Sequence, residues 1–198
     1  MSETALTPLP RDFYRRDPRV VAKALLNKVL VHGDRLGRIV EVEAYRGDVD
    51  PGSHAYRGMT ARNATMFGPP GGLYVYFTYG MHWCANAVCG EEGDGVAVLL
   101  RAVAPLDGLE AMHLARGPAV RRERDLCSGP AKLCQAFGLD GSFDGADLVS
   151  GDRGVTIIDD GTRPPRRPGN STRIGLTAGA EHPWRWYVPG DLNLSRRQ

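Results

Sequence analysis

Residues 73–88 constrain the fold most, because they have the pattern of two strands joined by a very short turn. The run LYVYFT alternates apolar side chains with tyrosine and threonine, which is typical of a strand with two different faces. Tyr79-Gly80 then gives a turn signal, and the small residues of CANAV read as a second strand. The segment therefore predicts a β-hairpin, with its two strands paired antiparallel.

Tyr79 is an unusual residue for the tip of such a hairpin. Turns are normally polar, because their backbone faces water. An aromatic side chain on a rigid turn can act as a wedge that enters a stack of nucleobases and fills the gap left by an extruded nucleotide. The alternative is a Tyr79 that folds back onto the sheet, which is common in hairpins.

The rest of the chain alternates predicted helices and strands. Asp17-Pro18 predicts a helix start, with Asp17 as N-cap and the helix continuing through residues 19–30. Helical spacing of apolar residues predicts a second helix over 105–116. Ser128 is expected to cap a third helix, 129–137, which stops at Gly138. The predicted strands outside the hairpin are 37–45, 96–103, 154–159, 172–177 and 185–188, and 161–172 reads as a basic, proline-rich surface loop.

This order of elements predicts an α+β fold, because the strands are joined by short turns and the helices come in separate blocks. With 198 residues and neither an internal repeat nor a long linker, we expect one domain spanning 1–198. The sequence has no Gly-x-Gly-x-x-Gly after a strand and no P-loop, so a nucleotide cofactor is not expected. A net charge of +2 is too small to indicate a partner.

The four cysteines, at 84, 89, 127 and 134, lack the short spacings of structural zinc sites. We interpret them as reduced, buried thiols of an intracellular protein. The N-terminal segment has no apolar run typical of a signal peptide, and no other run approaches the length of a membrane span. We therefore expect no membrane partner and a cytoplasmic location, nucleoid-associated if the source is bacterial.

A gap in acidic residues is the first feature that points to chemistry. Residues 51–90 contain no Asp or Glu, yet they hold Arg57, Arg62, His54, His82 and seven of the fifteen aromatic residues. Such a surface suits a polyanion whose bases can stack. The alternative is that these aromatics form the core and the segment is merely poor in acids.

The strand IVEVEAY is the second such feature. Alternation places Glu41, Glu43 and Tyr45 on one face, with Val40, Val42 and Ala44 on the other. Two glutamates on a half-exposed strand are usually solvated. His54 follows a short loop later, however, and a carboxylate, a tyrosine and a histidine together can activate water beside a stacked ring.

Four segments occur in one order and at comparable spacing: EVEAYRG, MFGPPGGLYVYFTYGMHWCAN, VLLRAVAPLDGLEAM and RDLCSGPAKLCQA. Together they closely resemble the alkyladenine (3-methyladenine) DNA glycosylase family, and the resemblance covers residues from about 9 to about 190. It implies one mixed domain with a curved, mainly antiparallel sheet flanked by helices. It also implies a monofunctional glycosylase of base excision repair that flips alkylated or deaminated purines out of duplex DNA and hydrolyses the N-glycosidic bond, with no metal or cofactor.

The resemblance assigns expected roles to the base pocket position by position. Glu43 matches the general base that activates the attacking water, and Arg101 matches a residue that helps to hold that water and a nearby phosphate. Tyr45 and His54 match the two residues that sandwich the flipped base. Tyr76 matches the aromatic residue at the edge of the pocket.

Other positions match residues that select the base or contact DNA. Asn86 matches the residue that checks position two of the purine, Tyr79 the intercalating tyrosine, and Met81 a contact to the opposed bases. Independently of the resemblance, Ser128 precedes open amides at a helix start and Lys132 lies one turn inside, which is the form of a phosphate site. A strand-cleaving glycosylase would need an amine nucleophile, and residues 43–86 contain no lysine.

The expected partner is therefore damaged double-stranded DNA, bound by a monomer. A nucleic-acid-binding module without catalysis is the alternative, because the family's fold also resembles a domain of a formyltransferase that acts on tRNA. A sugar glycosidase using Glu41 and Glu43 is disfavoured, since residues two apart on one strand cannot flank a scissile bond. The preferred lesion is not fixed by the sequence.

Overall fold

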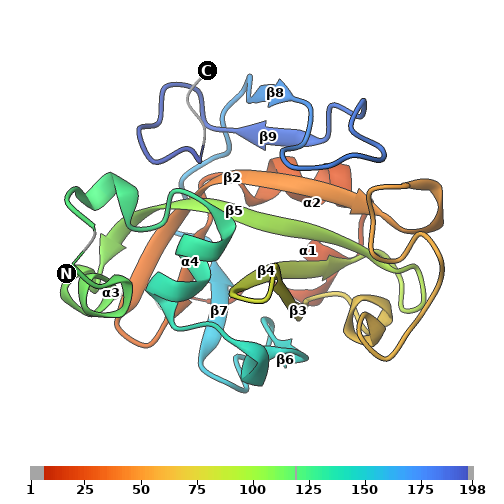
Figure 1. Ribbon diagram of the computed structural model, residues 1–198, viewed down its shortest axis with the longest axis horizontal. Helices are drawn as coiled ribbons and strands as arrows, with labels where there is room; N and C mark the ends of the chain where they lie inside the picture. The colour runs from red at the N-terminus through yellow and green to blue at the C-terminus, as the bar shows by residue number, and fades with distance from the viewer. Residues whose placement is uncertain (1–6, 119, 196–198) are drawn as a thin grey trace.

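The computed structural model describes residues 7–118 and 120–195, and its centre is an open antiparallel sheet (Figure 1). Nine strands belong to it among the described residues, in the order β6-β3-β4-β5-β2-β1-β7, with β9 pairing with both β2 and β8. The predicted α+β fold is confirmed, while the ends of the predicted 1–198 domain lie outside the described residues. The strands are β1 Val29–His32, β2 Arg35–Arg46, β3 Gly72–Thr78, β4 His82–Cys89, β5 Val96–Asp107, β6 Ala146–Asp147, β7 Val155–Ile158, β8 Gly169–Ser171 and β9 Arg185–Tyr187.

The α-helices of the described chain are α1 Arg11–Tyr14, α2 Pro18–Leu25, α3 Leu109–Arg116 and α4 Pro130–Phe137. The predicted start of α2 is confirmed, because the Asp17 side chain accepts a hydrogen bond from the backbone N–H of Arg19 at 2.9 Å. Its predicted end at residue 30 is wrong. Residues from Val29 onward pair with β2 and β7 as β1, so the sheet overrides the helical pattern.

Three other predicted boundaries also differ. Pro105 and Leu106 extend β5 instead of opening α3, because β5 pairs with the long β2 as far as Asp107. Ser128 is not the cap of α4: the N-cap is Gly129, without a side-chain bond. The predicted strand 172–177 is absent from the described sheet, whose β8 ends at Ser171.

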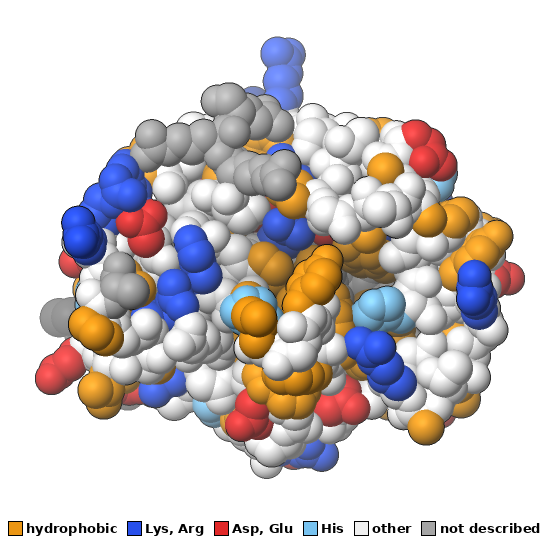
Figure 2. Space-filling view, viewed as in Figure 1, with side chains coloured by type: hydrophobic (Ala, Val, Ile, Leu, Met, Phe, Trp, Pro, Cys, Tyr) orange, Lys and Arg blue, Asp and Glu red, His pale blue; other side chains and the backbone are white. Residues whose placement is uncertain are grey.

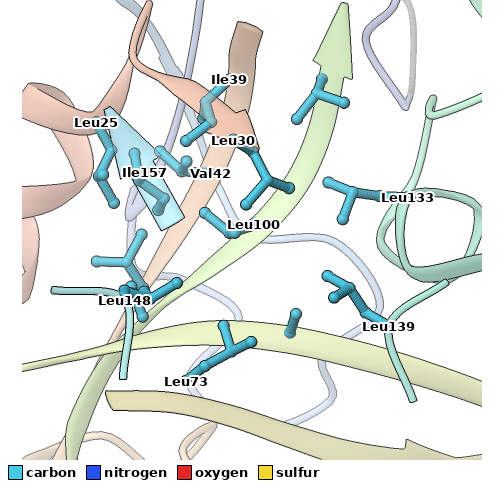
Figure 3. Packing of buried hydrophobic residues seen from close by; sticks show 14 of the residues in the cluster. Leu25, Leu30, Ile39, Val42, Leu73, Leu100, Leu133, Leu139, Leu148 and Ile157 are labelled. Atoms are coloured by element: carbon cyan, nitrogen blue, oxygen red, sulfur yellow. The ribbon is translucent and has the colours of Figure 1, made fainter. Parts of the chain in front are cut away.

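The main core lies on one face of the sheet. Side chains from the four α-helices and from most of the strands pack together there, and Figure 3 shows 14 of them from different elements. The residues labelled in Figure 3 are Leu25, Leu30, Ile39, Val42, Leu73, Leu100, Leu133, Leu139, Leu148 and Ile157.

All four cysteines are buried, and none forms a disulfide, which confirms the predicted thiols.

A smaller apolar cluster lies apart from this core. Tyr74, Val88 and Ala97 come from neighbouring strands, and Ala55 and Met66 come from the loop between β2 and β3. Tyr45, Phe67 and Tyr76 are partly buried against them. Both interpretations of the acid-poor segment 51–90, a stacking surface and a core, therefore hold in part. Some of its aromatic residues pack in this cluster, and others lie at the surface.

Two irregularities interrupt the pairing of β2 with β5. Ile39 pairs with Val103 but Glu41 pairs with Ala102, which leaves Val40 as an extra residue on β2. Val42 then pairs with Leu100, which leaves Arg101 as the extra residue on β5. Bulges bend a strand and re-aim side chains. As a result Ile39 packs with Val42 in the main core, while Val40, which alternation placed on the face of Val42, is buried outside that cluster.

Candidate active site

Strand register places a row of side chains across the face opposite the main core. Tyr74 pairs with Asn86, Asn86 pairs with Leu99, and Leu99 pairs with Glu43. Directly paired residues point to the same face, with Cβ atoms about 4.5–5.5 Å apart. The sheet therefore brings Glu43 and Asn86 to one surface, although 42 residues of chain separate them.

A pocket opens on this surface, with a volume of about 340 Å³ including its mouth. Its floor comes from the strands and its sides come from the loops after β2 and β8. The four predicted base-binding residues line it together, while Glu43 contacts the lining residue Tyr45 and Arg101 contacts Glu43. The lining residues are Tyr45, Gly52, His54, Met66, Tyr74, Tyr76, Asn86 and Leu176.

Glu43 is fully buried, with an exposed fraction of 0%, so the solvated interpretation of the glutamate pair is wrong. Its Oε2 accepts a hydrogen bond from the Tyr45 hydroxyl at 2.9 Å, and its Oε1 accepts one from the backbone N–H of Ile174 at 2.8 Å. Arg101 Nη1 lies 3.2 Å from the same Oε1. All three partners are donors, and a carboxylate held by donors beside a pocket can accept a proton from water.

Tyr45 is also fixed by its surroundings. Burial, followed by the negative charge of Glu43, raises the pKa of the Tyr45 phenol well above its usual value. The hydroxyl therefore stays protonated and donates to Glu43. The Arg173 guanidinium lies 4.6 Å from the centre of the Tyr45 ring and forms a buried ion pair with Asp50 at 2.6 Å. This ion pair ties Tyr45 to the loop that carries His54.

The opposite wall of the pocket is a group of three aromatic rings. His54 meets Tyr76 edge to face, with ring centres 4.5 Å apart, and Tyr74 stacks on Tyr76 at 5.4 Å. His54 Nδ1 and the Tyr74 hydroxyl are 3.1 Å apart. A flat, π-rich ligand is the kind of molecule that such walls bind. The Asn86 amide, whose Nδ2 donates to the Tyr74 carbonyl at 3.1 Å, lies at the same pocket.

His54 gives a prediction about stability and pH. Burial, and secondly the positive charge of Arg62, lower the pKa of His54 below its ordinary value. Below pH ~6.5 the unfolded chain then binds more protons than the folded one. The free energy of unfolding should therefore decrease as the pH is lowered below ~6.5. Urea denaturation at several pH values should show a smaller acid loss in His54→Gln than in the wild type. Identical slopes would contradict a buried, neutral His54.

The hairpin tip is exposed and stands apart from the pocket wall. Tyr79 is 82% exposed and Met81 is 67% exposed, so the alternative in which Tyr79 folds back onto the sheet is wrong. Figure 2 shows an apolar ridge over this hairpin, with arginine or lysine side chains on both sides. Tyr79 also has a φ of 51°, a conformation that is unfavourable for a bulky residue. A local preference is violated here, which is typical of a functional position.

Ser128 and Lys132 lie at a different place from the pocket. Lys132 Nζ is 3.3 Å from Ser128 Oγ, and both line a surface hollow with Arg122 and Arg124. Ser128 also pairs with Ala102, the residue that follows Arg101. The hollow is therefore adjacent to Arg101, at the charged end of the site that Arg101 forms with Glu43. A contact for the DNA backbone would lie in such a position.

The sequence did not single out Arg185 and Ser195, and it named Glu41 only as a solvated glutamate or in a disfavoured sugar glycosidase. Glu41 is fully buried and bonds to Arg101, Arg185 and Ser195, which come from distant parts of the chain. Arg185 and Ser195 lie 144 and 154 residues away from Glu41 in the sequence. A buried ion pair between such distant residues leaves no local pattern, so no signal in the sequence could have found it.

Comparison with known proteins identifies the family of the chain. The family model for methylpurine-DNA glycosylase (MPG) matches residues 12–192, which is nearly the whole chain. The chain belongs to the methylpurine-DNA glycosylase family. The predicted resemblance is confirmed, and none of the helices that the structure describes in this glycosylase is long and apolar enough to cross a membrane.

Relatives of the glycosylase occur in bacteria and archaea, and each of three is named as a candidate 3-methyladenine DNA glycosylase. The protein from Burkholderia lata is 57% identical over 188 residues, covering 94% of this chain and 90% of its own. That from Streptomyces avermitilis is 47% identical and covers 96% and 91%. That from Methanoculleus marisnigri is 46% identical and covers 96% and 99%. The likeness thus extends over almost the full length of both chains.

Proposed function

We propose that this DNA glycosylase acts as a monomer that extrudes alkylated or deaminated purines, such as 3-methyladenine, 7-methylguanine and hypoxanthine, from duplex DNA. It then hydrolyses the N-glycosidic bond. The observation that carries the proposal is a buried carboxylate, Glu43, beside a pocket walled by the rings of Tyr45, His54 and Tyr76. A module that only binds nucleic acid has no need of a buried carboxylate that can act as a general base.

In this proposal Glu43 is the general base. It accepts a proton from a water molecule as the oxygen of that water attacks C1′ of the sugar, and the electrons of the breaking C1′–N bond leave with the base. Arg101, 3.2 Å from Glu43, holds the water and the adjoining phosphate. Tyr45 keeps Glu43 in place through its 2.9 Å hydrogen bond. Attack by water needs no amine, in keeping with the absence of lysine from residues 43–86.

The wedge and the pocket divide the work of base extrusion. Tyr79 fills the gap that the extruded nucleotide leaves in the stack, and Met81 contacts the opposed bases. Tyr45 and His54 sandwich the flipped base, with Tyr76 at its edge. Ser128 and Lys132 bind a phosphate. Unstacking one base costs a few kcal/mol, which stacking in the pocket and on the wedge offsets.

The direct test is release of free purine from duplex DNA that contains one 3-methyladenine or one hypoxanthine, with DNA in excess over the protein. Multiple turnovers from both substrates, and none from the matched undamaged duplex, are expected. Tight binding to the lesion without release would identify a binding module and overturn the proposed reaction. Release of 3-methyladenine alone would remove hypoxanthine from the proposed substrates.

Asn86 is expected to exclude normal guanine. Guanine carries an amine at position two, which would clash with the Asn86 side chain or remain unpaired, whereas adenine and hypoxanthine carry only hydrogen there. Asn86→Ser should therefore raise the release of guanine relative to that of hypoxanthine, measured as the ratio of single-turnover rates. Asn27→Ser is the matched control, since the Asn27 side chain donates to the Arg163 carbonyl oxygen and does not line the pocket. A proportional loss on both bases would place the selection elsewhere.

A further inference from the structure

Arg101 is held on all three of its nitrogen atoms. Nε donates to Glu41 Oε1 at 3.0 Å, Nη1 lies 3.2 Å from Glu43 Oε1, and Nη2 donates to Ser195 Oγ at 3.2 Å. A guanidinium is planar, and its N–H groups have fixed directions. Two bonds, to Glu41 and Ser195, therefore decide where the third side of the group points. That side faces Glu43.

Glu41 in turn is held from several directions. Its Oε1 accepts hydrogen bonds from Arg101 Nε, from Arg185 Nε at 2.7 Å and from Ser195 Oγ at 2.7 Å. Its Oε2 accepts the backbone N–H of Ser195 at 2.6 Å. Burial by itself raises the pKa of Glu41, but Arg101 and then Arg185 and Ser195 lower it overall. The side chain is thus ionised and immobile.

Glu41 does not line the base pocket. Its effect on the pocket passes through Arg101, which it shares with Glu43. The bulge at Arg101 makes this sharing possible, because the extra residue on β5 turns its side chain toward both glutamates of β2. With Glu41 absent, Glu43 would be the only carboxylate left to pair with Arg101, and the guanidinium would lose its fixed orientation.

We propose that Glu41 is a positioning residue for base excision: together with Ser195, it orients Arg101 against Glu43 and keeps the guanidinium from closing over the reacting carboxylate. This inference rests on the proposed function. It makes Ser195, far from the pocket in sequence, a second positioning residue through its bonds to Glu41 and Arg101. It also explains why a second glutamate is buried here at all, where a leucine would cost less desolvation.

The test is a double-mutant cycle on the single-turnover excision rate per active enzyme. Glu41→Gln should lower the rate about tenfold, as expected for loss of a hydrogen bond to a charged group, with binding to an abasic-analogue duplex within about threefold of wild type. In an Arg101→Met background the same change should have no further effect, because Glu41 then has nothing to position. Independent, multiplying losses would overturn the proposal, and so would a Glu41→Gln rate equal to that of the wild type.

A matched pair of serines keeps the inference testable if Glu41→Gln does not fold. Ser195 contacts Glu41 and Arg101, whereas the Ser171 hydroxyl accepts from Arg185 at 2.8 Å and donates to the Thr172 carbonyl oxygen at 3.0 Å, without contact to Glu41 or Arg101. Ser195→Ala should slow excision, while Ser171→Ala should stay within about twofold of wild type; equal rates in the two variants would overturn the proposal. Wild-type protein is assayed in parallel. An inactive wild type would overturn the proposed function itself, whereas an active wild type with unimpaired variants would overturn only the role of Glu41.

Discussion

Glu43→Gln is expected to reduce single-turnover excision by ~10²–10⁴-fold, the usual contribution of a general base. The carboxamide keeps the shape of the side chain but cannot accept a proton from water. It also places an NH₂ group among partners that all donate, namely the Tyr45 hydroxyl, the Ile174 N–H and Arg101. Affinity for a hypoxanthine-containing duplex should remain close to that of the wild type, because Glu43 is not among the residues that line the pocket.

The measurement combines quench-flow or manual time courses of base release with fluorescence anisotropy of DNA binding. Glu110→Gln on the exposed face of α3 is the matched control, since it makes the same chemical change outside the site. A Glu43→Gln rate within a few-fold of the wild type would remove Glu43 from the role of base. A parallel loss of binding would show that Glu43 shapes the pocket instead.

Tyr79→Ser is expected to weaken the extruded state by ~1–3 kcal/mol, the value of stacking one base on an aromatic ring. The side chain is 82% exposed, so its removal leaves no cavity in the fold and the free energy of unfolding should change little. The loss of excision should be largest when the lesion is well paired and smaller when it is mismatched, because a mismatched base leaves the stack more easily.

Tyr79→Phe is the control, since it retains the ring and the same backbone demand at a φ of 51°. Excision by this variant should stay close to that of the wild type on paired and mismatched lesions. Equal losses for Tyr79→Ser on both substrates would show that the residue supports the hairpin and not the extruded base.

The hairpin shows what local patterns can predict in this chain. The alternation before Tyr79-Gly80 predicted β3 and β4, because side chains two apart on a strand share a face. Asp17-Pro18 predicted the start of α2 for an equally local reason, a cap bond two residues away. Both features depend on neighbouring residues alone, and both agree with the structure.

The bulges at Val40 and Arg101 show where such patterns fail. A bulge depends on how two strands pair, and the sequence of one strand does not contain that register. Alternation therefore placed Val40 on the face of Val42, whereas Ile39 joins Val42 in the main core and Val40 is buried outside that cluster. The burial of Glu41 and Glu43 could not be predicted for the same reason. Their burial depends on the arginines of β5 and β9, which local reasoning cannot connect to β2.

Most of the predicted site residues fall into three groups in space. Tyr45, His54, Tyr76 and Asn86 meet at one pocket because the strand register and one loop bring them there. Tyr79 and Met81 stand outside it on the hairpin, and Ser128 and Lys132 lie beside the charged end of the site. The roles of these residues remain predictions, which the substitutions above are designed to test.

The hydrogen bonds of Glu41 to Arg185 and Ser195 join residues that lie on opposite sides of the loop between β7 and β8, so a cut in that loop would divide the site between two fragments. Residues 161–167 form a largely exposed, proline-rich stretch between β7 and β8, and a protease cut there would separate Glu41 from both Arg185 and Ser195. Neither fragment would then hold a complete site, although the first would keep the whole base pocket except Leu176. The two pieces would regain activity only by reassociating through the pairing of β9 with β2. A nick at this loop is thus a natural place to build a split, complementation-based reporter from this fold.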